Sequence, residues 1–175
     1  MEKQNLLKMI EEFVSSAIEC KNIRERIEIK LHNGKGFYVQ WIRRGESTHY
    51  TVFVPEKLAK LSVLTRLSLL HELGHVLFNE MYYNEYGTLA NVMTKMRKKR
   101  WFSFLEKFYY WNPLIRKIKS WFGFSFPISY KASDLYDENF SEDYREFTRA
   151  DNEFFCDYFA VFIKNWDRLR VFVTN

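Results

Sequence analysis

Residues 71–75 of this chain read His-Glu-Leu-Gly-His. Positions i and i+4 of an α-helix lie on one face, one turn apart, so His71 and His75 can hold a single metal ion between them. Glu72 would then lie beside that ion, close enough to take a proton from a water molecule. This is the H-E-x-x-H pattern of zinc hydrolases. We therefore predict that His71 and His75 bind Zn²⁺ and that Glu72 is a general base.

The spacing of the histidines requires a helix. The segment favours one, because apolar residues surround the motif on more than one side, as in a helix buried over most of its circumference. The run Tyr50–Val54 favours a strand that ends near Pro55, a plausible strand-to-helix junction. These patterns predict a buried helix near residues 62 to 80. Either histidine alone could also be a core residue with one hydrogen bond, but the presence of a glutamate at the motif position 72 would then be a coincidence. The apolar positions are Leu58, Leu61, Leu64, Leu67, Leu70, Leu73, Val76 and Leu77.

A catalytic zinc ion takes three protein ligands and keeps one position for water, so a third ligand is expected elsewhere in the chain. Residues 145–160 read as a helix with many aromatic positions, and Glu153 and Asp157 lie one turn apart on one face of it. We predict Glu153 as the third ligand and Asp157 as the residue that orients His71 or His75. Glu146 and Asp151 remain alternative ligands, and a solvated acidic edge is the alternative to any role in metal binding.

The segment Glu153–Ala160 resembles the E-x-x-A-x-x-F-A helix that follows H-E-L-G-H in ImmA/IrrE-type metallopeptidases, small proteins of mobile elements and bacterial stress responses. The order of strand, helix and motif over residues 50 to 75 is similar too. The chain departs from that family at Cys156, where alanine is usual, and in a longer separation between His75 and Glu153. The segment is also similar to the metalloprotease domains of β-lactam sensor proteins and to CAAX-type prenyl proteases.

The resemblance implies a zincin-like α+β fold, in which a small antiparallel sheet lies beside a buried H-E-x-x-H helix and a C-terminal ligand helix. It implies a zinc-dependent endopeptidase with Glu153 as the third ligand. The implied substrate is another protein, and a DNA-binding repressor is one candidate. The alternative function is a zinc-binding regulatory or membrane-surface module without robust proteolysis.

Residues 24 to 54 show the alternation expected of a small antiparallel sheet. Ile27, Ile29 and Leu31 alternate with charged residues, and a turn signal follows at residues 33–36. Residues 37–41 alternate again before a second turn near Gly45.

Length and composition predict one packed domain over residues 1–175, because 47% of the residues are hydrophobic. A net charge of +5 permits contact with an anionic surface without requiring it. No signal peptide or membrane-spanning stretch is evident, and Cys20 and Cys156 lack metal-type spacing. We therefore expect a cytoplasmic protein with two buried free thiols.

Residues 81–145 read as an insertion between the two halves of the predicted site. A basic run over 95–100 precedes an aromatic stretch that reaches Phe122. The composition fits one or two helices packed on the domain, and it leaves open a peripheral membrane contact through residues 95–122. Nucleic-acid contact has no recognised motif to support it. The sequence does not indicate an oligomeric state.

Overall fold

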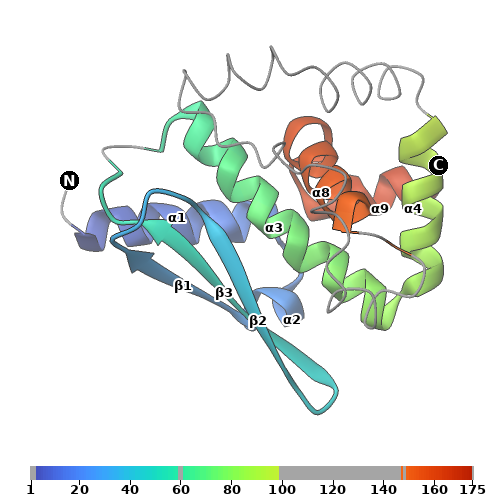
Figure 1. The fold of residues 1–175 in the computed structure, drawn as a ribbon, viewed down its shortest axis with the longest axis horizontal. Helices are drawn as coiled ribbons and strands as arrows, with labels where there is room; N and C mark the ends of the chain where they lie inside the picture. The colour runs from blue at the N-terminus through green and yellow to red at the C-terminus, as the bar shows by residue number, and fades with distance from the viewer. Residues whose placement is uncertain (1–2, 59–60, 99–146, 148, 175) are drawn as a thin grey trace.

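The computed structural model describes residues 3–58, 61–98, 147 and 149–174. Within them the chain forms a mixed α+β fold with a three-stranded sheet. Helix α3 passes between the sheet and the C-terminal helices α8 and α9 (Figure 1). No helix among these residues is long and apolar enough to cross a membrane.

The sheet consists of β1 (Ile27–His32), β2 (Tyr38–Arg44) and β3 (Ser47–Pro55) in the order β1-β3-β2. Strand β2 pairs antiparallel with β3 after a tight turn, where Gly45 adopts a φ of 61° that favours glycine. Strand β1 pairs parallel with β3. The expectation of a purely antiparallel sheet was therefore wrong.

Burial explains why β3 takes the central place. Tyr50, Val52 and Val54 on β3 are almost fully buried and face the helices, whereas β1 and β2 carry more exposed residues at alternate positions. The most apolar strand gains most from neighbours on both edges. β1 and β2 thus flank it instead of pairing with each other through the turn that joins them.

Helices α1 and α3 contact the sheet. Helix α1 (Lys3–Ala17) buries Leu6, Ile10, Val14 and Ala17 at helical spacing and contacts β1, as an amphipathic helix does. Helix α3 (Val63–Asn84) contacts β2 and β3. Between α1 and β1 lies the one-turn helix α2 (Lys21–Arg24).

Helix α3 contains the H-E-x-x-H motif, as predicted, and begins at Val63. The Ser62 side chain caps its start by accepting a hydrogen bond from the Thr65 backbone N–H at 3.2 Å. Pro55 therefore ends β3 but does not start the helix.

The remaining helices cover the side of α3 that faces away from the sheet. They are α4 (Tyr86–Lys98), α8 (Arg149–Tyr158), the π-helix η2 (Phe159–Ile163) and α9 (Trp166–Thr174). Both α8 and η2 pack directly on α3. The predicted C-terminal helix is thus present as α8.

Most of the predicted insertion lies outside the described residues, including nearly all of the segment proposed for membrane contact. Its beginning belongs to the last turn of α3 and to α4, which buries Leu89, Val92, Met93 and Met96.

Candidate metal centre

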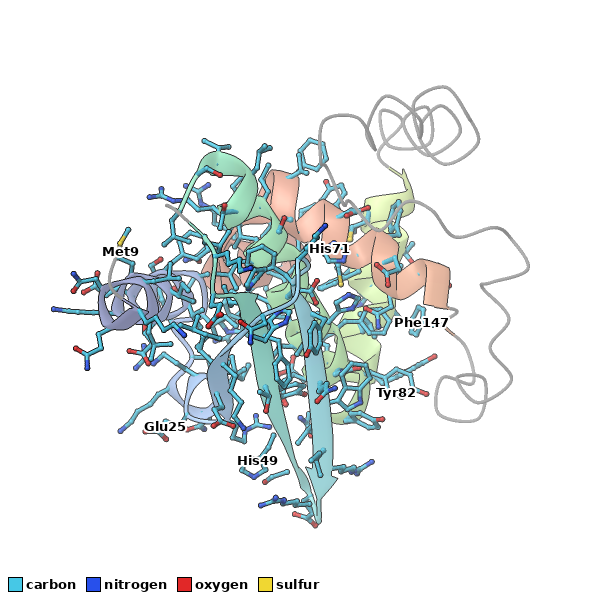
Figure 2. The ribbon with its side chains drawn as sticks, turned by 60° about the vertical axis from the view of Figure 1, so that its left-hand side comes forward. Met9, Glu25, His49, His71, Tyr82 and Phe147 are labelled. Atoms are coloured by element: carbon cyan, nitrogen blue, oxygen red, sulfur yellow. The ribbon has the colours of Figure 1, made fainter. Side chains whose placement is uncertain are left out.

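His71 and His75 lie on α3 with their rings 4.9 Å apart and nearly perpendicular. Both are turned toward α8, which contributes Glu153 and Asp157. His71 is 3% exposed, so its environment is set almost entirely by neighbouring side chains. Figure 2 shows His71 between the sheet and the C-terminal helices.

The Nε2 atoms of both histidines face the Glu153 carboxylate. One carboxylate oxygen lies 3.2 Å from His71 Nε2 and the other 3.9 Å from His75 Nε2. Zinc bonds of about 2.0–2.1 Å place tetrahedral ligand atoms about 3.3–3.4 Å from one another. The His71–Glu153 separation is close to that spacing, and the His75–Glu153 separation is about half an ångström wider.

The other ring nitrogens are held by different partners. Asp157 Oδ1 lies 2.9 Å from His71 Nδ1, and Asn152 Oδ1 lies 2.9 Å from His75 Nδ1. Each oxygen can accept a hydrogen bond from the Nδ1–H, which leaves the Nε2 lone pair for a metal. Asp157 had been predicted to orient one of the two histidines, and the structure places it on His71.

The electrostatic surroundings of His71 favour positive charge. Burial lowers its pKa, but hydrogen bonds and Coulomb attraction from Asp157 and Glu153 outweigh burial and raise the pKa to about 10. Two carboxylates beside one imidazole form an environment that would also stabilise a divalent cation.

Glu72 lies on α3 beside the histidines and close to β2. Burial raises the pKa of its carboxyl group, while the nearby histidines and a hydrogen bond from the Val39 backbone lower it. A raised pKa suits a group that must accept a proton and later release it.

Cys156 is a second candidate ligand, which the sequence analysis did not identify. His71, His75 and Cys156 have ligand atoms within 4.8 Å of one another, and this group could hold a metal ion, whose identity is not shown. Cys156 Sγ lies 3.2 Å from His75 Nδ1 and 3.3 Å from Asn152 Oδ1. It therefore approaches His75 at Nδ1, whereas Glu153 faces Nε2. Burial raises the pKa of the Cys156 thiol, so the thiolate needed for binding is disfavoured.

Gly74 explains how α3 and α8 approach so closely. A Cβ atom at this position would lie 2.8 Å from the Cys156 Cα atom, a backbone contact too short to relax easily. The glycine therefore allows the histidines of α3 to reach the carboxylates of α8.

Asn152 and Cys156 could have been identified from spacing. Positions 152, 153, 156 and 157 form one stripe on a helix that also carries the aromatic residues Phe154, Phe155 and Tyr158. The alternative ligand Asp151 is partly exposed, and Glu146 lies outside the described residues. Cys156 is buried as expected, but Cys20 is only partly buried.

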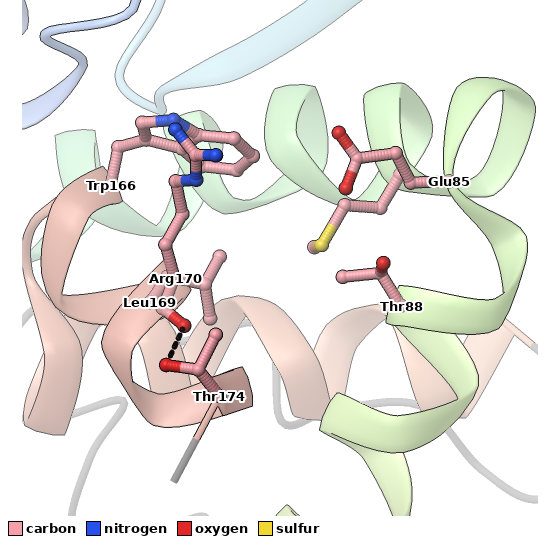
Figure 3. Close-up of a pocket in the computed structure, with 7 residues that line it drawn as sticks. Glu85, Thr88, Trp166, Leu169, Arg170 and Thr174 are labelled. Carbon is pink, nitrogen blue, oxygen red and sulfur yellow. Dashed lines mark hydrogen bonds between the residues drawn. The ribbon is translucent and has the colours of Figure 1, made fainter.

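A pocket of about 190 Å³ lies elsewhere, where the end of α3 meets α4 and α9 (Figure 3). Its volume is below the range of about 300–1,000 Å³ typical of small-molecule sites. It contains none of the histidine cluster, so we base the functional argument on the cluster. The lining residues are Met81, Glu85, Thr88, Trp166, Leu169, Arg170 and Thr174.

Comparison of the chain with protein-family models, with curated proteins and with solved structures finds no match.

Proposed function

We propose that this protein is a zinc-dependent endopeptidase that hydrolyses a peptide bond in a protein substrate. The observation that carries the proposal is the convergence of His71 Nε2, His75 Nε2 and the Glu153 carboxylate from two helices, with Glu72 beside them. Two imidazoles and one carboxylate are a standard ligand set of catalytic zinc, which keeps a fourth position for water.

The hydrogen bonds at the Nδ1 atoms of His71 and His75 support the same ligand set. Asp157 and Asn152 engage the Nδ1 atoms and direct both Nε2 atoms toward Glu153. Cys156 Sγ instead lies 3.2 Å from His75 Nδ1, the nitrogen that Asn152 already engages. We therefore favour Glu153 over Cys156 as the third ligand.

Bound zinc would polarise the scissile carbonyl and make a water molecule acidic enough to attack it near neutral pH. The Glu72 carboxylate accepts a proton from the attacking water and delivers it to the nitrogen of the leaving amine. The carbonyl carbon gains a C–O bond and loses its C–N bond. The products are a carboxylic acid and an amine.

The test is the variant Glu72→Gln, which keeps the size of the side chain but cannot accept a proton. The purified full chain should bind about one zinc ion as wild type and as variant. The wild type should cleave members of a quenched fluorescent peptide library, and the variant should lose about 10²–10⁴-fold in kcat/KM.

Glu46→Gln is the matched control, because Glu46 is exposed in the turn between β2 and β3. It should retain full cleavage. A zinc-loaded wild type that cleaves no library peptide would refute the endopeptidase and favour a zinc-binding regulatory module. Equal cleavage by wild type and Glu72→Gln would refute the role of Glu72.

A further inference from the structure

We propose that two copies of this chain associate through the outer edge of β1, so that their three-stranded sheets join into one continuous sheet. The candidate metal centre takes no part in this contact, so the proposed function can fail without affecting it. Two features of β1 support the contact. They are the backbone groups on its outer edge and the order of the charges along the strand.

The backbone of β1 is hydrogen-bonded to β3 on one side. The Tyr50 N–H donates a hydrogen bond of 2.8 Å to the Arg26 carbonyl, and the Glu56 N–H donates one of 2.9 Å to the His32 carbonyl. Backbone groups of residues two apart along a strand point to the same side. The even-numbered residues from 26 to 32 therefore face β3, and the odd-numbered residues face the outer edge.

The outer edge of β1 is thus formed by the N–H and C=O groups of Ile27, Ile29 and Leu31. In the part of the chain that the structure describes, no other backbone group is hydrogen-bonded to them. Strand β1 runs along the margin of the molecule in Figure 1, and no described element lies beyond it. An edge of this kind can pair with a strand of another chain.

The solvent face of β1 carries a charge pattern that is complementary to itself. Glu28 and Lys30 are both exposed, and Lys30 Nζ lies 2.9 Å from Glu28 Oε2. If an identical strand pairs antiparallel about a two-fold axis at Ile29, Glu28 of each copy lies opposite Lys30 of the other. A lysine alone discourages pairing at an edge, but here each lysine meets a carboxylate of the second copy.

Charge and hydrogen bonding both select this register. An axis at Glu28 or at Lys30 would place identical charges opposite each other, which is unfavourable. An axis at Ile27 or at Leu31 would pair only one end of the six-residue strand. An axis at Ile29 uses the whole strand and makes the two copies of Ile29 a hydrogen-bonded pair, because both backbone groups of this residue point outward. The contact uses the same segment of both chains, so it closes at two copies.

The opposite face of β1 would gain apolar burial in the dimer. Ile27, Ile29 and Leu31 are only partly buried, whereas the residues of β3 that pair with them are at most 1% exposed. In the dimer, Ile29 contacts its own copy and Ile27 contacts Leu31 of the second chain. These contacts remove from water the apolar surface that one chain leaves at the margin of its core.

Sedimentation of the full chain at increasing protein concentration and low salt tests for the dimer. One pair of strands is smaller than a standard interface, so we expect a dissociation constant between about 10 µM and 1 mM. Glu28→Lys and Lys30→Glu should each weaken dimerisation by about tenfold, because opposite charges across the interface become like charges. A wild type that stays monomeric up to about 1 mM would overturn the proposal.

A mixture of the two variants tests the register itself. The Glu28→Lys chain has two lysines on the solvent face of β1, and the Lys30→Glu chain has two glutamates there. A mixed dimer pairs each lysine with a glutamate, so the equimolar mixture should dimerise about as strongly as the wild type. The double variant Glu28→Lys/Lys30→Glu should recover in the same way. Failure of either recovery would overturn the assignment to β1.

Glu46→Lys is the matched control, because Glu46 is exposed in the turn between β2 and β3 and the change of charge is the same. It should dimerise like the wild type. A loss equal to that of Glu28→Lys would show that net charge, and not the edge of β1, governs association, and it would overturn the proposal.

Discussion

His71 and His75 have different hydrogen-bond partners although they occupy equivalent places in the motif. A carboxylate holds His71 Nδ1, whereas a carboxamide holds His75 Nδ1, at the same 2.9 Å. A carboxylate partner makes the imidazole a stronger donor to a metal than a neutral amide does. The two histidines should therefore contribute unequally to metal affinity, with His71 the stronger ligand.

Substitutions of Glu153 and of Cys156 should have opposite effects on the metal content of the protein. If Glu153 is the third ligand, Glu153→Gln should lose most of the bound zinc, because an amide oxygen is a weaker ligand than a carboxylate. Cys156→Ala should keep about one zinc per chain. Elemental analysis of proteins purified without added metal provides the measurement.

The two variants can be compared directly because Glu153 and Cys156 are both buried on α8. Cys156→Ala also removes the contact with His75 Nδ1, so it controls for disturbance of the histidine. Zinc lost in Cys156→Ala and retained in Glu153→Gln would reverse the ligand assignment.

Spacing predicted the three motif residues, and the apolar residues around them predicted their helix, because side-chain geometry on a helix is local. Asp157 was placed on a histidine for the same reason, but the choice of His71 depends on how α8 is aligned with α3. The alignment is a tertiary property, as is the contact of Cys156 with His75. A sequence therefore predicts which residues lie on one face of a helix more readily than which residues of another helix that face contacts.

At the scale of elements, the close packing of α3 on α8 determines whether the site can form. Gly74→Ala would place a Cβ atom 2.8 Å from the Cys156 Cα atom. We expect a loss of about 1–3 kcal/mol in the free energy of unfolding, as for other overpacked cores. Zinc affinity should fall as well, because separation of the helices moves both histidines from Glu153.

Gly87→Ala is the matched control for this substitution. A Cβ atom at Gly87 on α4 would meet nothing within 4 Å, and alanine has the higher helix propensity. Denaturant unfolding and zinc titration of both variants give the comparison. Unchanged zinc affinity in Gly74→Ala would show that the helix spacing is not needed for metal binding.

A second contact between elements holds α3 against the sheet. Arg26 donates two hydrogen bonds of 2.6 Å to the Glu80 carboxylate, and the Tyr50 hydroxyl donates a third at 2.7 Å. Glu80 is buried, so removal of Arg26 would leave a charged group without its main partner. Burial and the neighbouring Glu80 raise the pKa of the Tyr50 hydroxyl, which keeps it a hydrogen-bond donor.

We expect Arg26→Ala to lower the free energy of unfolding by about 3 kcal/mol, the lower end of the range for a broken buried ion pair. Arg24→Ala, on the neighbouring short helix, should cost much less. Chemical denaturation measures both. A stability loss in Arg26→Ala no larger than in Arg24→Ala would show that the contact with Glu80 does not hold α3 to the sheet.

The sheet shows which features of its arrangement can be predicted from the sequence. Alternation identified β1 and β2, since a half-buried strand exposes every second residue, and the run Tyr50–Val54 identified β3. Strand order was missed, because the turn at residues 33–36 suggested a hairpin between neighbours in sequence. The structure inserts β3 between β1 and β2, and only its stronger burial distinguishes it.

At the scale of the whole molecule, the candidate metal centre joins two parts of the chain that are distant in sequence. The hydrogen bond between His71 and Asp157 already connects residues 86 positions apart. A metal ion held by α3 and α8 would connect the same parts and would bind the folded state only. Its removal should therefore destabilise the whole fold, not just the site.

A ligand at 1,000 times its dissociation constant stabilises the folded state by about 4 kcal/mol. In a chain of this size each kcal/mol corresponds to about 2–4 °C, so zinc removal by a chelator should lower Tm by about 8–16 °C. Glu72→Gln should show the same shift, because Glu72 is not a ligand in the proposed site. His75→Ala should show little shift, because one ligand is missing. If the wild type has the same Tm with saturating zinc as with chelator, α3 and α8 are not joined through a metal. The pairing of the two helices would then depend on their packing and hydrogen bonds alone.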